Sequence, residues 1–408
     1  MSVLSRRKFL AATGVGTATL MTGLGTQLAL AQTPGSGDKL VVLFLSGGAD
    51  GLSMAPPHGY GSYYDLRPTT AIPEPGRNGG ALPLTSASSN GNAVFPTGLD
   101  GVVGLHPALA PIHSALWSQG RLAVIVGSGM DGVPLSHFAA TRYVQDGAPK
   151  GGRAGIGWLG RVADAVGGDG LVTSAHSDGA DRLVGGSFNR ANLIDHLGDF
   201  GLSNFRDEDQ VQAALTRFYR GTDSVSALGA QTVRVVDAAS GIDGALRPGY
   251  PDNRYGTAFS ELATILESGL GVQAAAIRGR GWDHHSGLAD GFNDNATEMA
   301  GGIRAFIDDT GLQGITLLVI TEFGRTLKEN GSRGTDHGNA YTALAMGAGI
   351  RGGVFGDDYP EALSGRSLPI HTDYRKIVSE ILSERVGVGD LRAIFPDYTQ
   401  NGYLGLAR

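Results

Sequence analysis

Four strongly apolar runs recur along the chain, and each ends in glycine and polar residues. They span residues 39–51, 121–130, 272–285 and 315–325. A run this apolar has no alternating polar face, so it predicts a central strand of a parallel sheet that is covered on both sides.

Helical patterns lie between these runs, over residues 107–120, 136–147, 258–269 and 296–311. Strands alternating with helices predict an α/β protein with a doubly wound, mainly parallel sheet and helices on both faces. In such a sheet ligands bind beyond the carboxyl ends of the strands, so the polar ends of the four runs should meet there.

The rest of the chain divides into less regular segments. Residues 66–105 are rich in Pro, Gly, Asn and Ser and predict an excursion over the ligand edge of the sheet, while residues 168–230 lack a clean period and predict a cap. Residues 355–387 end in an amphipathic helical pattern that includes Ile377, Ile381 and Val386. We expect residues 38–408 to form one domain with these insertions.

Residues 1–31 have the pattern of a secretory signal. Arg6 and Arg7 are followed by Phe9, Leu10 and a modest apolar stretch, and Ala29-Leu30-Ala31 forms a small-x-small cleavage site. The paired arginines indicate the twin-arginine route, with the twin-arginine translocase as partner and the periplasm or the exterior as destination. Glycines and threonines interrupt the stretch well short of about 20 apolar residues, so no stable membrane span is expected.

Charge and cysteine content narrow the possible functions. The formal charge of the 408-residue chain is −7, and removing the signal, which carries three basic residues and no acid, makes it −10. Without clustered Lys and Arg, nucleic acid is not an expected partner. The chain has no cysteine, which excludes disulfides, thiolate metal sites and a Cys nucleophile.

The first candidate functional residues lie at the end of the first predicted strand and at the start of one predicted helix. Asp50 follows the first apolar run, where a turn or cap role is the simpler alternative to metal binding. Ser136 opens the helical pattern of residues 136–147, so it is either an N-cap or a nucleophile activated by a nearby metal. His137 beside it is a candidate supporting or substrate-binding residue.

The third polar end reads Asp283-His284-His285. In an extended segment residues i and i+2 face the same side, so Asp283 and His285 can bind one ion while His284 points away, as a supporting residue.

The fourth polar end carries Glu322 directly after a buried run. A carboxylate there requires a cation or several hydrogen bonds. Arg325 is a candidate supporting or substrate-binding residue, and an ion pair between it and Glu322 is the alternative to metal binding. Asp336 and His337 follow on a glycine-rich return.

Together these ends place oxygen and imidazole donors at one edge of the sheet. They are sufficient for one or two divalent ions, with Zn, Mn, Mg and Ca all open. The expected metal ligands are Asp50, Asp283, His285, Glu322, Asp336 and His337.

Motifs distributed in order from about residue 38 to the end resemble one bacterial family, called domain of unknown function fifteen hundred and one. The motifs are LVVLFLSGGADGLS, YYDLRPTTAIP, LHPALAPI, SHFAATRYVQDG, GWLGR, WDHHSG, TEFGRT, GTDHG and TDYRKIVSEIL. That family is similar in fold to the alkaline phosphatase and sulfatase superfamily, and its members often carry twin-arginine signals.

The resemblance implies roles for particular residues. Asp50 would match the first-strand metal ligand of the superfamily, Ser136 the nucleophile, and Asp283 with His285 an Asp-His ligand pair. Glu322 and Asp336-His337 would fill the late ligand positions, although in the superfamily the late Asp and His stand directly at the strand end. This departure bears on whether two metals bind.

The leading hypothesis is an exported, metal-dependent hydrolase of phosphate or related esters, with Ser136 as nucleophile. The alternative is a non-catalytic binding or assembly protein of the cell envelope that keeps a phosphatase-like fold. An α/β-hydrolase esterase is disfavoured because no serine lies in a G-x-S-x-G elbow. Sulfatase activity is disfavoured because SHFAATR lacks the spacing of a formylglycine precursor.

Overall fold

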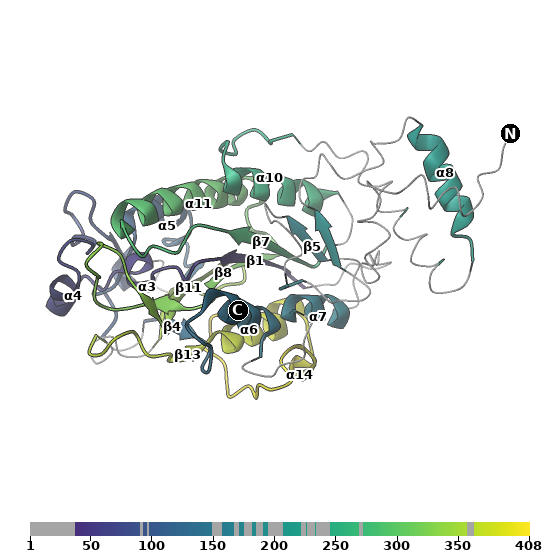
Figure 1. The fold of residues 1–408 in the computed structure, drawn as a ribbon. Coiled ribbons are helices and arrows are strands. Elements are labelled where there is room, and N and C mark those ends of the chain that lie inside the picture. Colours follow the sequence, from purple (N-terminus) through teal and green to yellow (C-terminus); the bar gives the residue numbers. More distant parts are fainter. Residues whose placement is uncertain are drawn as a thin grey trace.

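A nine-stranded sheet runs through the described part of the chain, with helices above and below it (Figure 1). The strand order is β12-β4-β11-β8-β1-β7-β5-β6, and β13 also pairs with β4. β11 is antiparallel to its neighbours β4 and β8, and the other pairings are parallel. The predicted α/β class with a mainly parallel sheet is confirmed. The strands are β1 (Lys39–Leu45), β4 (Leu122–Gly129), β5 (Leu171–Ser174), β6 (Ala191–Ile194), β7 (Ala274–Gly279), β8 (Ile315–Thr321), β11 (Tyr341–Gly347), β12 (Gly353–Phe355) and β13 (Thr372–Asp373).

The computed structural model describes residues 37–89, 93–95, 98–148, 157–166, 171–174, 182–184, 191–194, 207–221, 226, 233, 245–268, 272–356 and 363–408. The predicted signal over residues 1–31 lies outside these ranges. None of the helices within them combines the length and apolarity that crossing a lipid bilayer requires.

The alternating residues of β1 pack on opposite faces of the sheet. Val41 and Leu43 belong to one buried cluster, whereas Val42 and Phe44 belong to a second cluster on the other face. Because both faces of the strand are covered, successive positions can all be apolar without meeting water, which explains the continuous apolar run.

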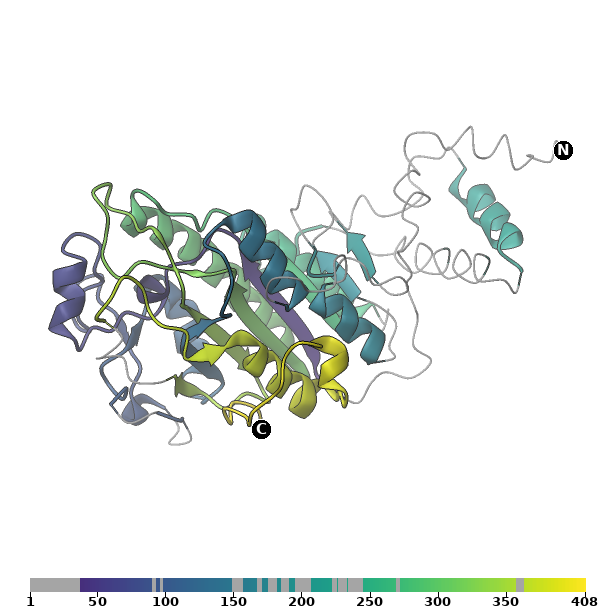
Figure 2. The same cartoon turned by 60° about the horizontal axis from the view of Figure 1, so that its bottom comes forward.

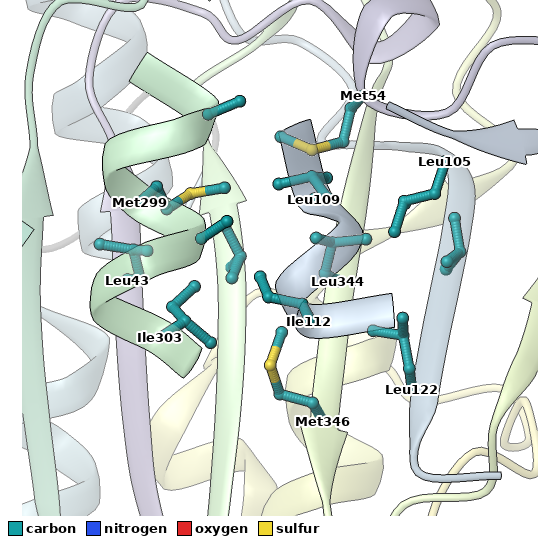
Figure 3. Close-up of a cluster of buried hydrophobic side chains, with 14 of the residues drawn as sticks. Leu43, Met54, Leu105, Leu109, Ile112, Leu122, Met299, Ile303, Leu344 and Met346 are labelled. Carbon is teal, nitrogen blue, oxygen red and sulfur yellow. The ribbon is translucent and has the colours of Figure 1, made fainter. Parts of the chain in front are cut away.

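Helices cover each face of the sheet (Figure 2). The first cluster includes side chains of α3 (Gly51–Met54), η2 (Pro107–Leu109), α5 (Ala110–Leu116), α10 (Arg254–Glu267) and α11 (Leu288–Thr310). Figure 3 shows Met299 and Ile303 of α11 near Leu43 of β1, and Leu344 of β11 near Leu109 and Ile112. The second cluster includes side chains of α6 (His137–Asp146), α7 (Trp158–Ala165), α13 (Tyr374–Ile381), the π-helical turn η4 (Leu382–Val386) and α14 (Leu391–Ile394).

Two helices differ in length from their sequence patterns. The pattern over residues 107–120 becomes a short 3-10 turn and the seven-residue α5, a segment that contains Pro107 and Pro111. α11 begins at Leu288 rather than at residue 296, because Leu288 and Phe292 continue its buried stripe through a polar first turn. The amphipathic C-terminal helix is confirmed as α13, with Ile377 buried.

The two irregular segments also have different roles. Residues 66–105 carry a small antiparallel sheet of β2 (Leu82–Pro83) and β3 (Gly104–Leu105) and the turn η1 (Ser86–Ser88), with α4 (Gly61–Leu66) just before them. Leu84 and Val103 of this segment belong to the first buried cluster. In residues 168–230, β5 and β6 extend the main sheet and α8 (Glu208–Phe218) follows, while much of the predicted cap lies outside the described residues.

Candidate metal centre

The ends of three neighbouring strands are level with one another. Leu45 of β1 pairs with Gly279 of β7 on one side and with Thr321 of β8 on the other. The segments that follow these strands therefore emerge at the same edge of the sheet, as expected for parallel strands. The short pair β9 (Gly324–Arg325) and β10 (His337–Gly338) then folds the later loop back to that edge.

Three histidines and one aspartate converge at this edge. One ligand atom from each of His137, Asp283, His285 and His337 lies within 4.8 Å of the other three. The Nε2 atom of His285 is 2.9 Å from that of His337 and 3.1 Å from Asp283 Oδ1. His137 Nε2 is 3.3 Å from Asp283 Oδ2, and His337 Nε2 is 3.9 Å from Oδ1.

Each of the three imidazole rings is held by its other nitrogen. His137 Nδ1 is 2.8 Å from Glu322 Oε1, and His337 Nδ1 is 2.9 Å from the carbonyl oxygen of Leu135. His285 Nδ1 is 3.4 Å from Asp336 Oδ1. Carbonyl and ionised carboxyl oxygens only accept hydrogen bonds, so these partners favour a proton on Nδ1 and leave the Nε2 atoms facing the cluster.

This arrangement calls for a cation. The Nε2 atoms of His285 and His337 are 2.9 Å apart, a separation that requires a proton or a metal ion between them. Burial lowers the pKa of His337, which disfavours the proton. His137 Nε2 is buried without a hydrogen-bond partner among the described residues.

The distances between the donor atoms also fit a metal ion. For metal–nitrogen bonds of about 2.0–2.1 Å, the ligand atoms of a tetrahedral ion lie about 3.3 Å apart. Four of the contacts in the cluster, from 2.9 to 3.9 Å, bracket this separation, and one ligand atom from each residue lies within 4.8 Å of the others. The four side chains therefore form a cluster that could hold a metal ion, and Asp283 and His285, 44% and 46% exposed, leave it open to solvent.

Arg325 holds Asp283 in place. Its guanidinium donates to Asp283 Oδ1 at 2.6 Å, to the carbonyl oxygens of Gly48 at 2.7 Å and Thr335 at 3.1 Å, and to the carbonyl oxygen of Gly47. Burial alone would raise the pKa of Asp283, but Arg325 outweighs burial and the pKa is lowered. Asp283 is therefore a carboxylate available to a cation.

The positions of Glu322 and His137 relative to the cluster are the reverse of those predicted. Glu322 was predicted to bind metal, but its buried carboxylate accepts from the backbone N–H of Gly47, the hydroxyl of Thr321 and the ring of His137. The hydrogen bond that His137 donates to Glu322 is the main cause that raises the pKa of His137. His137, predicted to support the site, is instead one of the four converging donors.

The structure does not bring Asp50 into the cluster. Both of its oxygens accept from the Arg67 guanidinium at 2.8 Å, and they also accept from Ser53 N and the Thr335 hydroxyl. These four hydrogen bonds surround a carboxylate that is 1% exposed, so the described contacts of Asp50 are those of a buried ion pair. Local sequence could not reveal Arg67 as partner, although it lies within the YYDLRP motif.

The remaining candidates divide between the site and its surroundings. Asp336 lies beside His285 but outside the group of four, where it orients the ring. His284 is buried, with Nε2 3.3 Å from Asn295, so it points away from Asp283 and His285 as the alternation predicts. Ser136 is exposed at the start of α6, and its side chain makes no capping hydrogen bond.

Ser136 lies between two residues that contact the cluster. The carbonyl of Leu135 before it bonds to His337, and the ring of His137 after it belongs to the group of four. A hollow of about 320 Å³ adjoins the cluster, lined in part by His137, Asp283 and Glu322. Arg278, which also lines it, is a residue that sequence reasoning missed.

Comparison with known proteins gives one family and several remote structural likenesses. The zinc-bound C-terminal periplasmic domain of EcEptC from Escherichia coli is 9% identical, with a TM-score of 0.34 and coverage of 79% of this chain and 77% of its own. Alkaline phosphatase from the Antarctic bacterium TAB5 is 12% identical, with a TM-score of 0.29 and coverage of 79% and 95%. PsFucS1 sulfatase from Pseudoalteromonas sp. is 12% identical, with a TM-score of 0.35 and coverage of 99% and 78%. No curated protein matches the chain.

At these TM-scores the likenesses support no conclusion by themselves, so the fold class rests on the strand order. Fold and site together define an α/β protein with a cluster of three histidines and one aspartate at the carboxyl edge of its sheet. The chain belongs to the family described as protein of unknown function (DUF1501), whose model matches residues 126–362, more than half of the sequence.

Proposed function

We propose that this protein is an exported, metal-dependent hydrolase of phosphate or related esters. One observation carries the proposal: three Nε2 atoms with anchored rings and one carboxylate converge beside a solvent-open hollow. A site built only for structure would gain nothing from an adjoining hollow, whereas a hydrolase requires room for substrate next to the ion.

His137, Asp283, His285 and His337 would hold the ion. Imidazole-rich donor sets suit Zn²⁺ and similar transition metals better than Mg²⁺ or Ca²⁺. We propose one ion rather than two, because Asp50 is fully engaged by Arg67. A bound divalent ion supplies Lewis acidity toward a phosphoryl oxygen.

Ser136 is the proposed nucleophile. Its hydroxyl oxygen would form a bond to phosphorus as the bond to the leaving-group oxygen breaks. The hydroxyl proton goes to solvent, and the leaving group takes a proton from solvent. Water then hydrolyses the phosphoserine, which restores the hydroxyl and releases phosphate. The uncapped, exposed hydroxyl between two cluster-contacting residues supports this role.

Elemental analysis and turnover test the proposal. The purified protein should bind about one equivalent of Zn²⁺ or Mn²⁺, and a variant with Asp283→Ala and His285→Ala should lose it. The metal-loaded protein should hydrolyse p-nitrophenyl phosphate, and Ser136→Ala should abolish turnover. The exposed residues Asp294 and Ser286 provide matched alanine controls that should leave metal content and turnover unchanged.

A second function is favoured by one feature of the same site. Four protein donors are sufficient to fill a tetrahedral ion, as in structural metal sites. A non-catalytic binding or assembly protein of the cell envelope would then retain the ion for stability. Retained metal in Ser136→Ala, together with no turnover of phosphate monoesters or diesters by the wild-type protein, would favour this alternative.

Export by the twin-arginine translocase is part of the proposal. It rests on the Arg6-Arg7 pair and the small-x-small site before Gln32. Replacing both arginines by lysine should leave the precursor in the cytoplasm of a bacterial host, as fractionation and immunoblotting would show. Processing and release unchanged by the double replacement would contradict this route.

A further inference from the structure

The hollow beside the cluster has walls of different chemical character. It holds about 320 Å³ and is lined by cluster and loop residues together with Ser46, Phe138, Thr141 and Arg278. A space of this size is at the lower end of small-molecule sites. Its charged walls therefore bear on which part of a substrate would bind there.

Both carboxylates that line the hollow already have partners. Asp283 accepts from Arg325 at 2.6 Å and lies 3.3 Å from His137 Nε2. Glu322 accepts from Gly47 N at 2.8 Å, from the Thr321 hydroxyl at 2.9 Å and from His137. Neither acid is paired with Arg278 across the hollow.

Arg278 is the cation with unused donors. It is half-buried on β7, the strand that leads to Asp283, one residue before that strand ends. Its Nε donates to Ser46 Oγ at 2.8 Å, which orients the guanidinium plane, while its two terminal nitrogens have no partner in the part of the chain that the structure describes. A guanidinium held in this way binds two oxygens of a tetrahedral anion in a forked geometry.

We infer that Arg278 binds non-bridging oxygens of the substrate and selects monoesters of phosphate or sulfate over diesters. The inference rests on the proposed function, because it places the phosphoryl or sulfuryl group that Ser136 would attack in the space between the cluster and Arg278. A monoester has three non-bridging oxygens, enough for a forked bond to Arg278 and one contact with the cluster. A diester has only two, so it must give up one of these contacts.

Phe138 defines the other wall of the hollow. It follows His137 on α6, and its side chain is 94% exposed. An apolar ring this exposed gains by contact with an apolar or planar leaving group. The favoured substrate is therefore a monoester whose leaving group has an apolar face.

Anion binding provides a test that does not depend on turnover. Inorganic phosphate and sulfate would be titrated separately by calorimetry into metal-loaded wild-type protein and into Arg278→Gln. Loss of hydrogen bonds to a charged group should weaken binding of the preferred anion about 10- to 100-fold. Arg278→Lys should recover part of the loss because it keeps the charge but not the fork.

The matched control is Arg142→Gln. Arg142 lies on α6, is 50% exposed and is 3.8 Å from Asp146, and it does not line the hollow. It removes the same charge and should bind anions as wild type does. Unchanged anion affinity in Arg278→Gln, or equal weakening by both variants, would overturn the inference.

Turnover separates the selectivity from the proposed function itself. Arg278→Gln should lower kcat/KM for p-nitrophenyl phosphate about tenfold more than for bis-p-nitrophenyl phosphate. Equal losses on the two esters would refute the selection of monoesters. Arg278-dependent anion binding without turnover of any ester would refute hydrolysis while keeping the anion site.

Discussion

The family resemblance assigns Asp50 to a metal site. The variant Asp50→Asn tests whether this residue binds metal or instead stabilises the fold. In the structure Asp50 and Arg67 form a two-pronged ion pair with both N–O distances at 2.8 Å. Asparagine keeps the size of the side chain but removes its charge. It also places an amide NH₂ opposite a guanidinium N–H, so a donor faces a donor.

The expected loss of stability follows from the burial of both partners. Asp50 is 1% and Arg67 0% exposed, so Arg67 would keep its charge in a site that water does not reach. Breaking a buried pair in this way costs about 3–5 kcal/mol. The entropy of unfolding is about 2.1 cal/mol/K per residue, or about 0.8 kcal/mol/K for about 370 residues, so the melting temperature should fall by about 5 °C.

Calorimetric melting and elemental analysis on the same samples make the assay. Asp50→Asn should melt lower than wild type while holding the same amount of metal. Glu74→Gln, which breaks the exposed Arg77–Glu74 pair, is the control and should stay within about 0.5 kcal/mol of wild type. Loss of metal without a lower melting temperature in Asp50→Asn would refute the structural assignment.

The dependence of stability on pH gives the same test a second readout. Burial would raise the pKa of Asp50, but the charge and hydrogen bonds of Arg67 outweigh it and the pKa is lowered. A carboxyl whose folded pKa lies below its unfolded value, about 3.9, stabilises the protein above that pH. The contribution is lost as the pH falls through the folded pKa, and Asp50→Asn should lack this part of the acid sensitivity.

Four further outcomes are expected. Glu322→Gln should weaken metal binding about 10- to 100-fold in a chelator competition titration, because His137 loses its carboxylate acceptor; Glu329→Gln is the control, and equal affinities would contradict this role. Glu380→Gln should lower the free energy of unfolding by about 2–3 kcal/mol and speed amide hydrogen exchange over residues 404–407, because the buried Glu380 carboxylate accepts three backbone N–H groups there. Unchanged exchange protection would contradict this role. Gly324→Ala should reduce soluble yield, because a Cβ would lie 1.6 Å from the carbonyl oxygen of Ala340; normal yield and melting would contradict that contact. Zn²⁺ at about 100 times its Kd should raise the free energy of unfolding of the wild-type protein by about 2.7 kcal/mol. An equal increase in the variant with Asp283→Ala and His285→Ala would show that the ion binds elsewhere.

Much of the fold could be predicted because it depends on local pattern. The runs that form β1, β4, β7 and β8 are apolar at successive positions, a pattern typical of strands that are covered on both faces. β11 was not predicted, although it lies between β4 and β8. Its antiparallel place depends on pairing with distant strands, and periodicity does not encode which strands pair.

Sequence alone determined that polar residues would gather at the carboxyl edge of the sheet and that Asp283 and His285 would face the same side. These conclusions follow from the direction of parallel strands and from the two-residue repeat of extended chain. Only the tertiary structure decided that His137 joins the cluster while Glu322 supports it, and that Asp50 pairs with Arg67. Those assignments depend on which side chains meet across the fold, because a buried carboxylate takes whichever cation or donor the packing brings within about 3 Å.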